Sequence, residues 1–466
     1  MDRKKERGLW IGVTSVLALV LVAIVLAPRA LAQSDNSRTS QEYLRDIEKA
    51  FMIVSSNYVD EVDPKVLFEG VMNGLMGSLD DPYSNYLTDE TLTDYTDVIT
   101  GSFVGVGLYI SKEWIDPENP HGRQPYVRVM APIEGTPGWK AGINAGDYIY
   151  AIDGVSAENY STADVSNKLR GAPGTSVKVT FLRNGTTFDV TLVREAVEIP
   201  SVKSEVIQNR WGYLRIIDWN PNTAERVKEV LEGFNDKGVE GLILDVRGNT
   251  GGLMTAATDT LDLFFSSGTL VSAEYRDRRF DQVTRAKPGQ VVPAGMPIVL
   301  LVNGSSASAS EIFTGALKDR GRATVIGQKT FGKGVIQSIF DVSDASISLT
   351  IGRYYTPNGS YIQKKGIEPD IPVEDPTLTD EQAAAYSKLL QENQVGLFLD
   401  AHPSPSARQI DSFIAGLKSQ GIDPGDRLMR ILVKREEERR MNVPPVVDLE
   451  YDDVLLRGIQ FLETGK

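Results

Sequence analysis

The segment IVLLVNGSSASASEIFTGAL, residues 298–317, passes from an apolar run through a polar turn into a second apolar pattern. Its opening residues, Ile298 to Val302, predict a buried strand, and the apolar residues from Ile312 to Leu317 recur at the spacing of one helix face. The segment therefore predicts a strand that leads directly into a helix.

The same order of strand, helix and strand precedes this segment. YLRII at 213–217 and GLILDV at 241–246 have the composition of buried strands, and an apolar helix face lies between them, from Val227 to Phe234. Strands that alternate with helices are typical of layered α/β proteins. The sequence therefore predicts an α/β core, which we place at residues 196–375.

Ser308 lies where the predicted strand meets the helix, and the residues around it leave two roles open. Ser308 and Glu311 fit the S-x-x-E capping box, so the serine could cap the helix. The N–H groups and dipole of a helix start also favour negative charge, which suits an oxyanion beside a nucleophilic serine. Such a serine needs a base, but His121 and His402 both lie in polar, Pro-rich loops. The expected base is therefore a lysine.

Lys333 closes the stretch GQKTFGK, residues 327–333, which matches the G-x-x-x-x-G-K pattern of a phosphate-binding loop. Gly334 stands where that loop needs a Ser or Thr for Mg²⁺, and the flanking segments read as strands, so nucleotide binding is not expected. Lys333 is then either an exposed loop lysine or a base. Burial among apolar neighbours such as Phe331 and Val335 would lower the pKa of its amine.

The composition of the chain limits its function. It has 466 residues, a net charge of −14, a pI near 4.9 and 41% hydrophobic residues, enough for several domains with proper cores. An acidic chain without a basic and aromatic stripe repels phosphate backbones, so nucleic acid is not an expected partner. With no cysteine, disulfides, thiol catalysis and cysteine-based zinc sites are excluded, and no HExxH motif is present. We expect no metal and no cofactor.

The amino terminus predicts export. Four basic residues within the first seven precede an uncharged stretch from Leu9 to Ala27. As a helix this stretch would span about 28 Å, close to the thickness of a bilayer core. ALA at 30–32 also fits a signal-peptide cleavage site, so segment 1–32 is either a membrane anchor or a cleaved signal peptide. In both cases the basic end is expected in the cytoplasm and the rest of the protein outside it.

Three further regions flank the predicted core. Residues 33–100 carry two apolar patterns at helical spacing, and residues 101–195 carry short β-type runs separated by Gly, Pro and Asn turns. Residues 376–466 are helical and charged, and their KREEERR run is read as a solvated helix face.

Several separated motifs together resemble the C-terminal processing peptidases, also called tail-specific proteases, over residues 40–375. These motifs are SASASEI, TFGKG with Gln337, SLDDPYS at 78–84, GSFVGVG at 101–107, DVRGNTGG at 245–252 and YYTPNGSYIQKKGIEPD at 354–370. The resemblance implies a Clp-protease/crotonase-like α/β core, a PDZ domain inserted before it, and helical end segments that could support a homodimer.

The resemblance also implies roles for individual residues. Ser308 would be the nucleophile, Lys333 the general base, and Gln337 the group that orients the lysine. The alternative for Gln337 is a polar residue on a strand face.

An oxyanion hole is implied by the same likeness. Its donors would be the N–H of Ala309 and an N–H of the turn that holds Gly251 and Gly252. A bare turn would also explain two adjacent glycines after a strand. Relatives typically have proline where this chain has Thr250, which leaves the exact donor of this turn open.

The β region at 101–195 resembles a PDZ domain, most closely in PIEGTPGWKAGINAGDYIYAIDG at 132–154. Such domains bind a peptide as an added strand and hold its carboxylate with loop N–H groups. Gly105, Val106, Gly107 and Leu108 form the candidate loop, with a plain β-turn as the alternative reading of these residues.

These inferences predict an exported serine endopeptidase that captures protein C-terminal tails through its PDZ domain and cleaves them with a Ser-Lys dyad. The membrane would be a further partner if the amino-terminal segment is retained. One alternative is a PDZ peptide-binding or chaperone module with an inert protease core. Another is a crotonase-like acyl-transfer enzyme, for which the sequence offers no coenzyme A site.

Overall fold

The computed structural model describes residues 38–465 apart from 89–91, 93–99, 112–124, 134, 145, 159, 184–185, 199, 344, 375–376 and 442. It divides into two compact units, Met1–Pro82 and Tyr83–Lys466. The expected anchor or signal segment at 1–32 and His121 lie outside the described residues. Among the helices that are described, none combines the length and the apolar character needed to cross a bilayer.

The described part of the first unit contains the helices α2 (Ser40–Asn57) and α3 (Pro64–Gly77). Thr39 and Glu42 form a capping box at the start of α2, and the side chain of Asp63 accepts the N–H of Lys65 at the start of α3. Both predicted helical patterns therefore form helices. Their apolar residues are largely exposed within the unit, and no residue of α2 is buried.

The second unit is built on a six-stranded sheet. Its strands are, in spatial order, β10 (Val202–Ile207), β11 (Trp211–Ile216), β12 (Gly241–Asp245), β15 (Ile298–Val302), β16 (Thr324–Gly327) and β19 (Ile371–Pro372). The first two strands are antiparallel, and all later neighbours are parallel. The carboxyl ends of β11, β12 and β15 therefore meet at one edge, where parallel α/β sheets place their sites.

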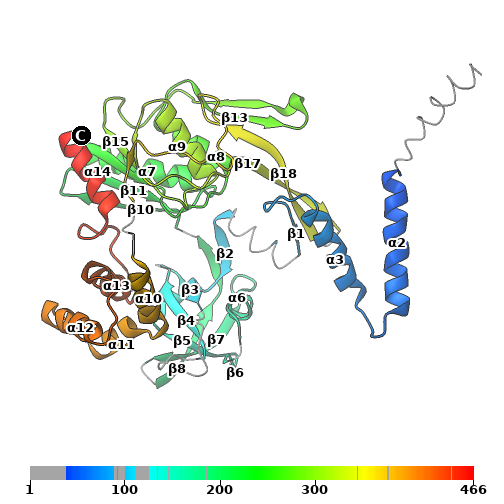
Figure 1. The fold of residues 1–466 in the computed structure, drawn as a ribbon, viewed down its shortest axis with the longest axis horizontal. Helices are drawn as coiled ribbons and strands as arrows, with labels where there is room; N and C mark the ends of the chain where they lie inside the picture. Colours follow the sequence, from blue (N-terminus) through cyan, green and yellow to red (C-terminus); the bar gives the residue numbers. More distant parts are fainter. Residues whose placement is uncertain are drawn as a thin grey trace, which may run out of the picture. The chain divides into compact units, whose positions relative to one another are not determined.

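Helices cover both faces of this sheet (Figure 1). One face packs against α7 (Thr223–Asp236), α8 (Met254–Leu261) and α9 (Ala309–Asp319), and the other packs against α14 (Asp453–Thr464). Successive residues of a strand point to opposite faces. Leu242 and Leu244 of β12 thus join the first cluster, whereas Ile243 joins the second with Leu455 and Ile459 of α14.

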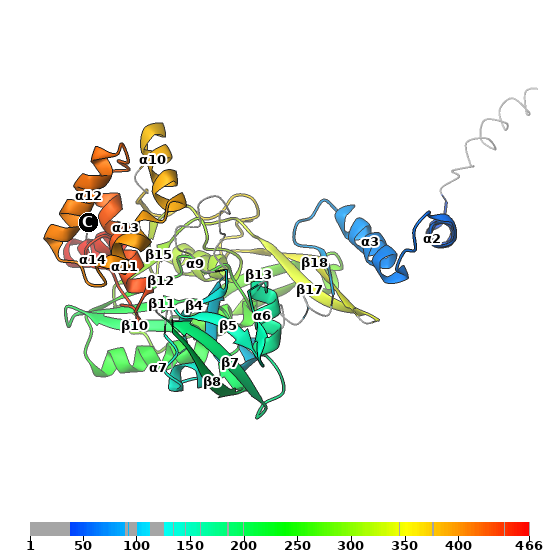
Figure 2. The same ribbon diagram turned by 90° about the horizontal axis from the view of Figure 1, so that it is seen from below.

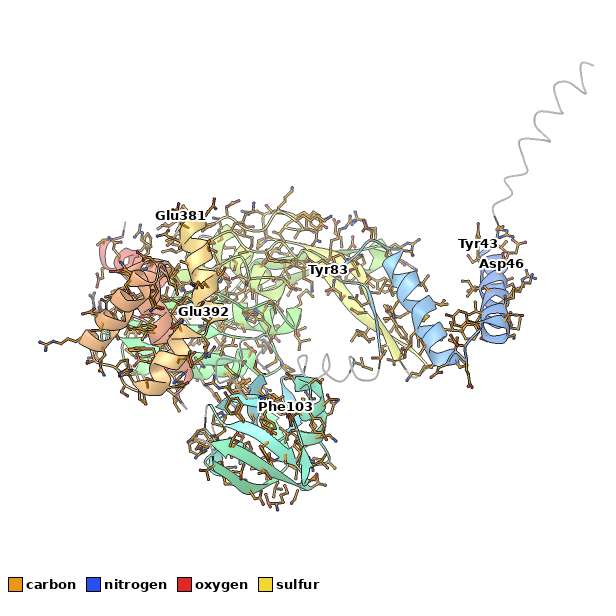
Figure 3. The ribbon with its side chains drawn as sticks, turned by 60° about the horizontal axis from the view of Figure 1, so that its bottom comes forward. Tyr43, Asp46, Tyr83, Phe103, Glu381 and Glu392 are labelled. Carbon is orange, nitrogen blue, oxygen red and sulfur yellow. The ribbon has the colours of Figure 1, made fainter. Side chains whose placement is uncertain are left out.

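A second sheet lies beside the first in the core. Its strands are β1 (Asn85–Leu87), β18 (Ala345–Tyr355), β13 (Thr269–Tyr275), β14 (Gln282–Arg285) and β17 (Val335–Val342), with the short helix η1 (Arg278–Phe280) between β13 and β14. β17 and β18 form a long antiparallel hairpin, and β1 pairs with β18 at residues 346–348. Figure 3 labels Tyr83 beside this hairpin, just before β1.

The mostly β region has its own core. It comprises β2 (Ser102–Gly105), β3 (Leu108–Ser111), β4 (Val127–Pro132), α5 (Pro137–Lys140), β5 (Tyr148–Ile152), β6 (Val155–Ser156), α6 (Thr162–Leu169), β7 (Ser176–Arg183), β8 (Thr186–Val193) and β9 (Glu195–Glu198). The main sheet has the order β3-β4-β5-β7-β8, so β3 is an edge strand among the described strands. Figure 3 labels Phe103 in this region, on β2.

The carboxyl-terminal helices fall into two groups, which are separate in Figure 1 and overlap in the view of Figure 2. A bundle with its own apolar cluster is formed by α10 (Asp380–Gln391), α11 (Gln394–Ala401), α12 (Ala407–Ser419) and α13 (Asp426–Arg439). The last helix, α14, instead completes the core, although it comes from the segment predicted as one helical region. With this addition, the α/β core, the mostly β region and the terminal helices confirm the predicted fold class.

Candidate active site

Ser308 has a backbone conformation that a helix cap does not require. It lies between β15 and α9 with φ +57° and ψ −116°, which is the first central position of a type II′ turn and normally holds glycine. An ordinary N-cap residue is extended, with negative φ. A non-glycine residue in such a region costs about 1–3 kcal/mol and marks a functional site when the surroundings impose it.

Glu311, on the first turn of α9, joins this serine to the loop that carries Lys333. Its buried carboxylate accepts the N–H of Ser308 at 3.0 Å and the N–H of Lys333 at 2.8 Å through the same oxygen, Oε2. The other oxygen accepts the Thr330 hydroxyl at 2.6 Å and the N–H of Gly332 at 2.8 Å. One carboxylate thus holds the backbones of both predicted dyad residues close together.

Tyr354 makes a second link between the same two residues. Its hydroxyl donates to the carbonyl oxygen of Lys333 and lies within hydrogen-bond reach of the Ser308 side chain. The ammonium nitrogen of Lys333 lies 4.8 Å from the ring centre of Tyr83. The structure therefore gathers Ser308 and Lys333 at one place, and the transfer of a proton between their side chains stays a prediction.

Gln337 is on β17, four residues beyond Lys333. Its side-chain amide donates to the Thr350 hydroxyl at 3.3 Å, and the N–H of Thr350 donates to the hydroxyl of Ser84 at 3.0 Å. This pairing fits a residue on a strand face, and the orienting role of Gln337 stays a prediction.

Gly251 brings its backbone against the serine. A Cβ built on it would lie 2.7 Å from Cβ and 3.2 Å from Oγ of Ser308, and its φ is +117°. Its N–H donates to Oδ1 of Asn249 at 2.9 Å, so the turn itself uses this amide. Gly252 is therefore the better candidate for an oxyanion donor from this turn. Ala309 is the first residue of α9, where N–H groups have no intrahelical acceptor.

The glycine turn is fastened to the serine loop by hydrogen bonds. The carbonyl of Asn249 accepts the N–H of Ala307 at 3.1 Å and the hydroxyl of Ser310 at 3.0 Å. The side chain of Asn303 accepts the N–H of Gly248 at 3.0 Å, and the hydroxyl of Ser306 donates to the Val246 carbonyl at 2.9 Å. These hydrogen bonds therefore tie the loops after β12 and β15 to each other at the edge of the sheet.

Burial raises the pKa of two groups at this site. Burial raises the pKa of Glu311, and the hydrogen bonds from Thr330, Lys333, Gly332 and Ser308 act in the opposite direction. Burial also raises the pKa of Tyr354, and the neighbouring charge of Glu311 adds to that effect. Tyr354 is therefore a neutral hydrogen-bond donor at physiological pH.

Sequence reasoning assigned no site role to Glu311, Tyr354 or Tyr83. Glu311 was considered only as part of a capping box, and its carboxylate does accept the Ser308 N–H here. The two tyrosines lie in SLDDPYS and YYTPNGSYIQKKGIEPD, which were quoted for the resemblance. Their sequence spacing from Ser308 gave no sign that they would approach it.

The candidate tail-binding loop of the β region lies between β2 and β3. Val106 is buried, and Gly107 has a φ of +73°. Their carbonyls accept the N–H groups of Gly138, at 2.8 Å, and Ile133, at 2.9 Å. Val106 shares an apolar cluster with Leu169 of α6. The loop therefore lies directly before the edge strand β3, and its Val106 packs near α6.

Metal ligands do not gather at this site. Across the part of the chain that the structure describes, no group of three or more His, Asp or Glu side chains is arranged to hold a metal ion. His402 is in the helical bundle, where its ring stacks on Phe398 with centres 5.0 Å apart.

Comparison with known proteins gives matches for three regions. Residues 24–91 match the "Activating protease CtpB N-terminal domain", residues 128–183 a "PDZ domain", and residues 210–373 "Peptidase family S41".

Whole-chain relatives agree with these matches. The chain is 31% identical to the carboxy-terminal processing protease CtpA of Bacillus subtilis, over 81% of this chain and 78% of that protein. It is 34% identical to the carboxy-terminal-processing protease of Bartonella bacilliformis, over 82% and 86% respectively. Identity to the carboxy-terminal processing protease CtpB of Bacillus subtilis is 33%, over 92% and 87%.

Proposed function

Because this chain belongs to the C-terminal processing peptidase family, we propose that it is a serine endopeptidase that acts on proteins with accessible C-terminal tails. Ser308 is the proposed nucleophile and Lys333 the proposed base. The main support is the single oxygen of Glu311 that accepts the N–H groups of both residues, at 3.0 and 2.8 Å. The strained conformation of Ser308 supports the same reading, since a cap would not need it.

The proposed reaction has two halves. Oγ of Ser308 attacks the scissile carbonyl while Lys333 accepts the serine proton, and Lys333 then protonates the leaving amine. Water attacks the acyl-enzyme in the second half, with Lys333 again taking and returning a proton. The N–H groups of Ala309 and Gly252 would stabilise the oxyanion in both halves. No step requires a cofactor.

Tail capture is assigned to the β region. β3 lies at the edge of its sheet, so an extended peptide can pair with it as an added strand. The loop from Gly105 to Leu108 would hold the terminal carboxylate with its N–H groups. Val106 of this loop packs in the buried apolar cluster that also holds Val165 and Leu169 of α6, so the place proposed for the end of the tail adjoins apolar side chains, which favours an apolar last residue.

We also propose export and self-association. The amino-terminal segment at 1–32 would direct the rest of the protein out of the cytoplasm, as an anchor or as a cleaved signal peptide. A second copy of the chain would cover the apolar residues that α2 and α3 leave exposed, among them Leu44 at 64% and Val66 at 61%.

Cleavage of a defined substrate tests this function. The full chain is incubated in detergent with an unstructured protein that ends in apolar residues, beside Ser308→Ala and Lys333→Ala. We expect each variant to lose at least about a thousandfold in kcat. Lys329→Ala is the matched control, because Lys329 is an exposed lysine of the same loop, paired with Glu368 at 2.8 Å. It should cleave like the parent.

The same assay separates the alternatives. An inert PDZ module would bind the tail without cleaving it. Equal cleavage by the parent and Lys333→Ala would exclude the lysine as base. Activity should also rise with pH as the base loses its proton, and a flat profile between about pH 5 and 9 would contradict general-base catalysis by an amine.

A further inference from the structure

An ion pair connects the glycine turn to the last helix of the chain. The guanidinium of Arg247 binds the carboxylate of Asp452 through two parallel hydrogen bonds, Nη1 to Oδ1 and Nη2 to Oδ2, each 2.7 Å long. Their side chains are only 17% and 21% exposed. Bidentate geometry fixes orientation as well as distance, so this pair constrains where Arg247 lies.

Arg247 also holds the end of β12. Its Nε and Nη2 groups bind the fully buried carboxylate of Asp245, the closest contact being 2.6 Å, and its backbone N–H binds the same carboxylate at 2.9 Å. The hydroxyl of Tyr213 donates to Asp245 at 2.8 Å. Arg247 thus spans two carboxylates, one at the strand end and one on α14.

Arg247 connects these two ion pairs to the proposed oxyanion hole. Arg247 immediately precedes the turn from Gly248 to Gly252, whose Gly251 lies against Ser308. Asp452 is equally fixed on its side, because its Oδ1 also accepts the N–H of Leu455 and caps α14. Two buried side chains of α14 hold that helix on the sheet.

The helical bundle reaches the same segment from the other side. Arg427 of α13 binds the carboxylate of Asp453 at 2.7 Å and the carbonyl of Tyr451 at 3.3 Å. Lys434 of the same helix binds the carboxylate of Asp448 at 2.6 Å. Residues 448–453 are therefore held between the bundle and Arg247, and we refer to them as the latch segment.

We propose that Asp452 is a positioning residue for the turn from Gly248 to Gly252, and that the latch segment couples the helical bundle to that turn. The proposal rests on the proposed function, since the turn matters as an oxyanion donor. It assigns a role in catalysis to a carboxyl-terminal region that contributes no residue to the reaction itself. Neutralising Asp452 would free Arg247 from one of its two anchors and allow the turn to move.

Asp452→Asn tests the proposal with little change of shape. The variant keeps Oδ1, so it can still cap α14 and accept one bond from Arg247, but it loses the charge and the second acceptor. We expect kcat to fall about tenfold with KM nearly unchanged, because coupling of this kind is worth up to about 2 kcal/mol. Amide hydrogen exchange of residues 246–252 should become faster in the folded protein.

Two further variants complete the experiment. Glu240→Gln removes the carboxylate of an exposed ion pair, the one between Arg210 and Glu240 at 2.7 Å. This control variant should leave kcat and the amide hydrogen exchange of the turn unchanged. Arg427→Gln loosens the bundle side of the latch segment, and we expect a loss of about two- to threefold in kcat with faster exchange in the turn.

Each outcome decides the proposal. A normal kcat in Asp452→Asn, or a lower kcat without faster exchange in the turn, would overturn the positioning role. An Arg427→Gln protein identical to the parent would overturn the coupling to the bundle. If the parent itself cleaves nothing, the proposed function fails, and the exchange measurements still show whether Asp452 holds the turn.

Discussion

Replacing Glu311 with glutamine changes one oxygen into an amide group at the point where Ser308 and Lys333 meet. Oε1 could still accept from Thr330 and Gly332, at 2.6 and 2.8 Å. In place of Oε2, however, the NH₂ group would face two N–H donors that now lie 3.0 and 2.8 Å from the oxygen. In either orientation of the amide its NH₂ group faces at least one backbone N–H, and two donors cannot bond to each other, so the contacts that join the serine to the lysine loop cannot all be kept.

The size of the effect follows from these contacts. A hydrogen bond to a charged group is worth about 1.5–3 kcal/mol, so two such bonds set a gross loss of about 3–6 kcal/mol. The amide avoids the desolvation that raises the pKa of Glu311, which offsets part of that loss. We expect a net decrease of about 2–4 kcal/mol in the free energy of unfolding near neutral pH, and a fall in kcat of about a hundredfold, because misplacement by about 1 Å has that cost.

Cleavage kinetics and denaturant unfolding measure the two quantities. Glu368→Gln is the control, because this exposed glutamate pairs with Lys329 of the same loop region at 2.8 Å and should tolerate the change. A Glu311→Gln protein with kcat within about threefold of the parent would refute the argument that this carboxylate sets the distance between nucleophile and base.

The pH dependence of the unfolding free energy tests the direction of the Glu311 pKa shift. Because burial raises the pKa of Glu311 in the folded state, the pH-dependent part of its contribution to stability is complete below the unfolded-state pKa and is lost as the pH rises through the folded-state pKa. The stability difference between parent and Glu311→Gln should therefore be largest at acid pH and shrink as pH rises. A difference that grows with pH would mean that the folded-state pKa is lowered. Parent activity should fall at acid pH, since a protonated carboxyl loses an acceptor for these N–H groups.

Three other substitutions test the site and the core. Gly251→Ala should abolish cleavage because its Cβ would lie 2.7 Å from Cβ and 3.2 Å from Oγ of Ser308, whereas Gly289→Ala, with a similar φ of +122° and open space around it, should remain active. Tyr83→Phe should cleave nearly like the parent because the ring that faces Lys333 remains, and Tyr83→Ala should lower kcat about tenfold, because water would then reach the amine and favour its protonated form. Ile459→Ala should lower the free energy of unfolding by about 2–4 kcal/mol, measured in denaturant, although this residue is far along the chain from the catalytic motifs.

The sequence by itself determined the main elements of the core and singled out the residues that we propose for its chemistry. Apolar periodicity located the strand from Ile298 to Val302 and the helix that follows it, because the apolar residues of a buried strand or helix recur at a spacing that is characteristic of that element. Motif spacing singled out Ser308 and Lys333, and the family that the motifs resembled is confirmed by relatives that share 31–34% identity over most of the chain.

Only the tertiary structure decided what brings those residues together. Glu311 looked like a helix cap, yet its carboxylate joins two loops, because the strand order places the loop after β16 beside the start of α9. Arg247 and Asp452 form an ion pair across 205 positions of sequence, and no local pattern records such a contact. Apolar periodicity in the sequence indicates whether a residue is buried. Which residue it contacts in the folded protein depends on how distant segments of the chain pack together.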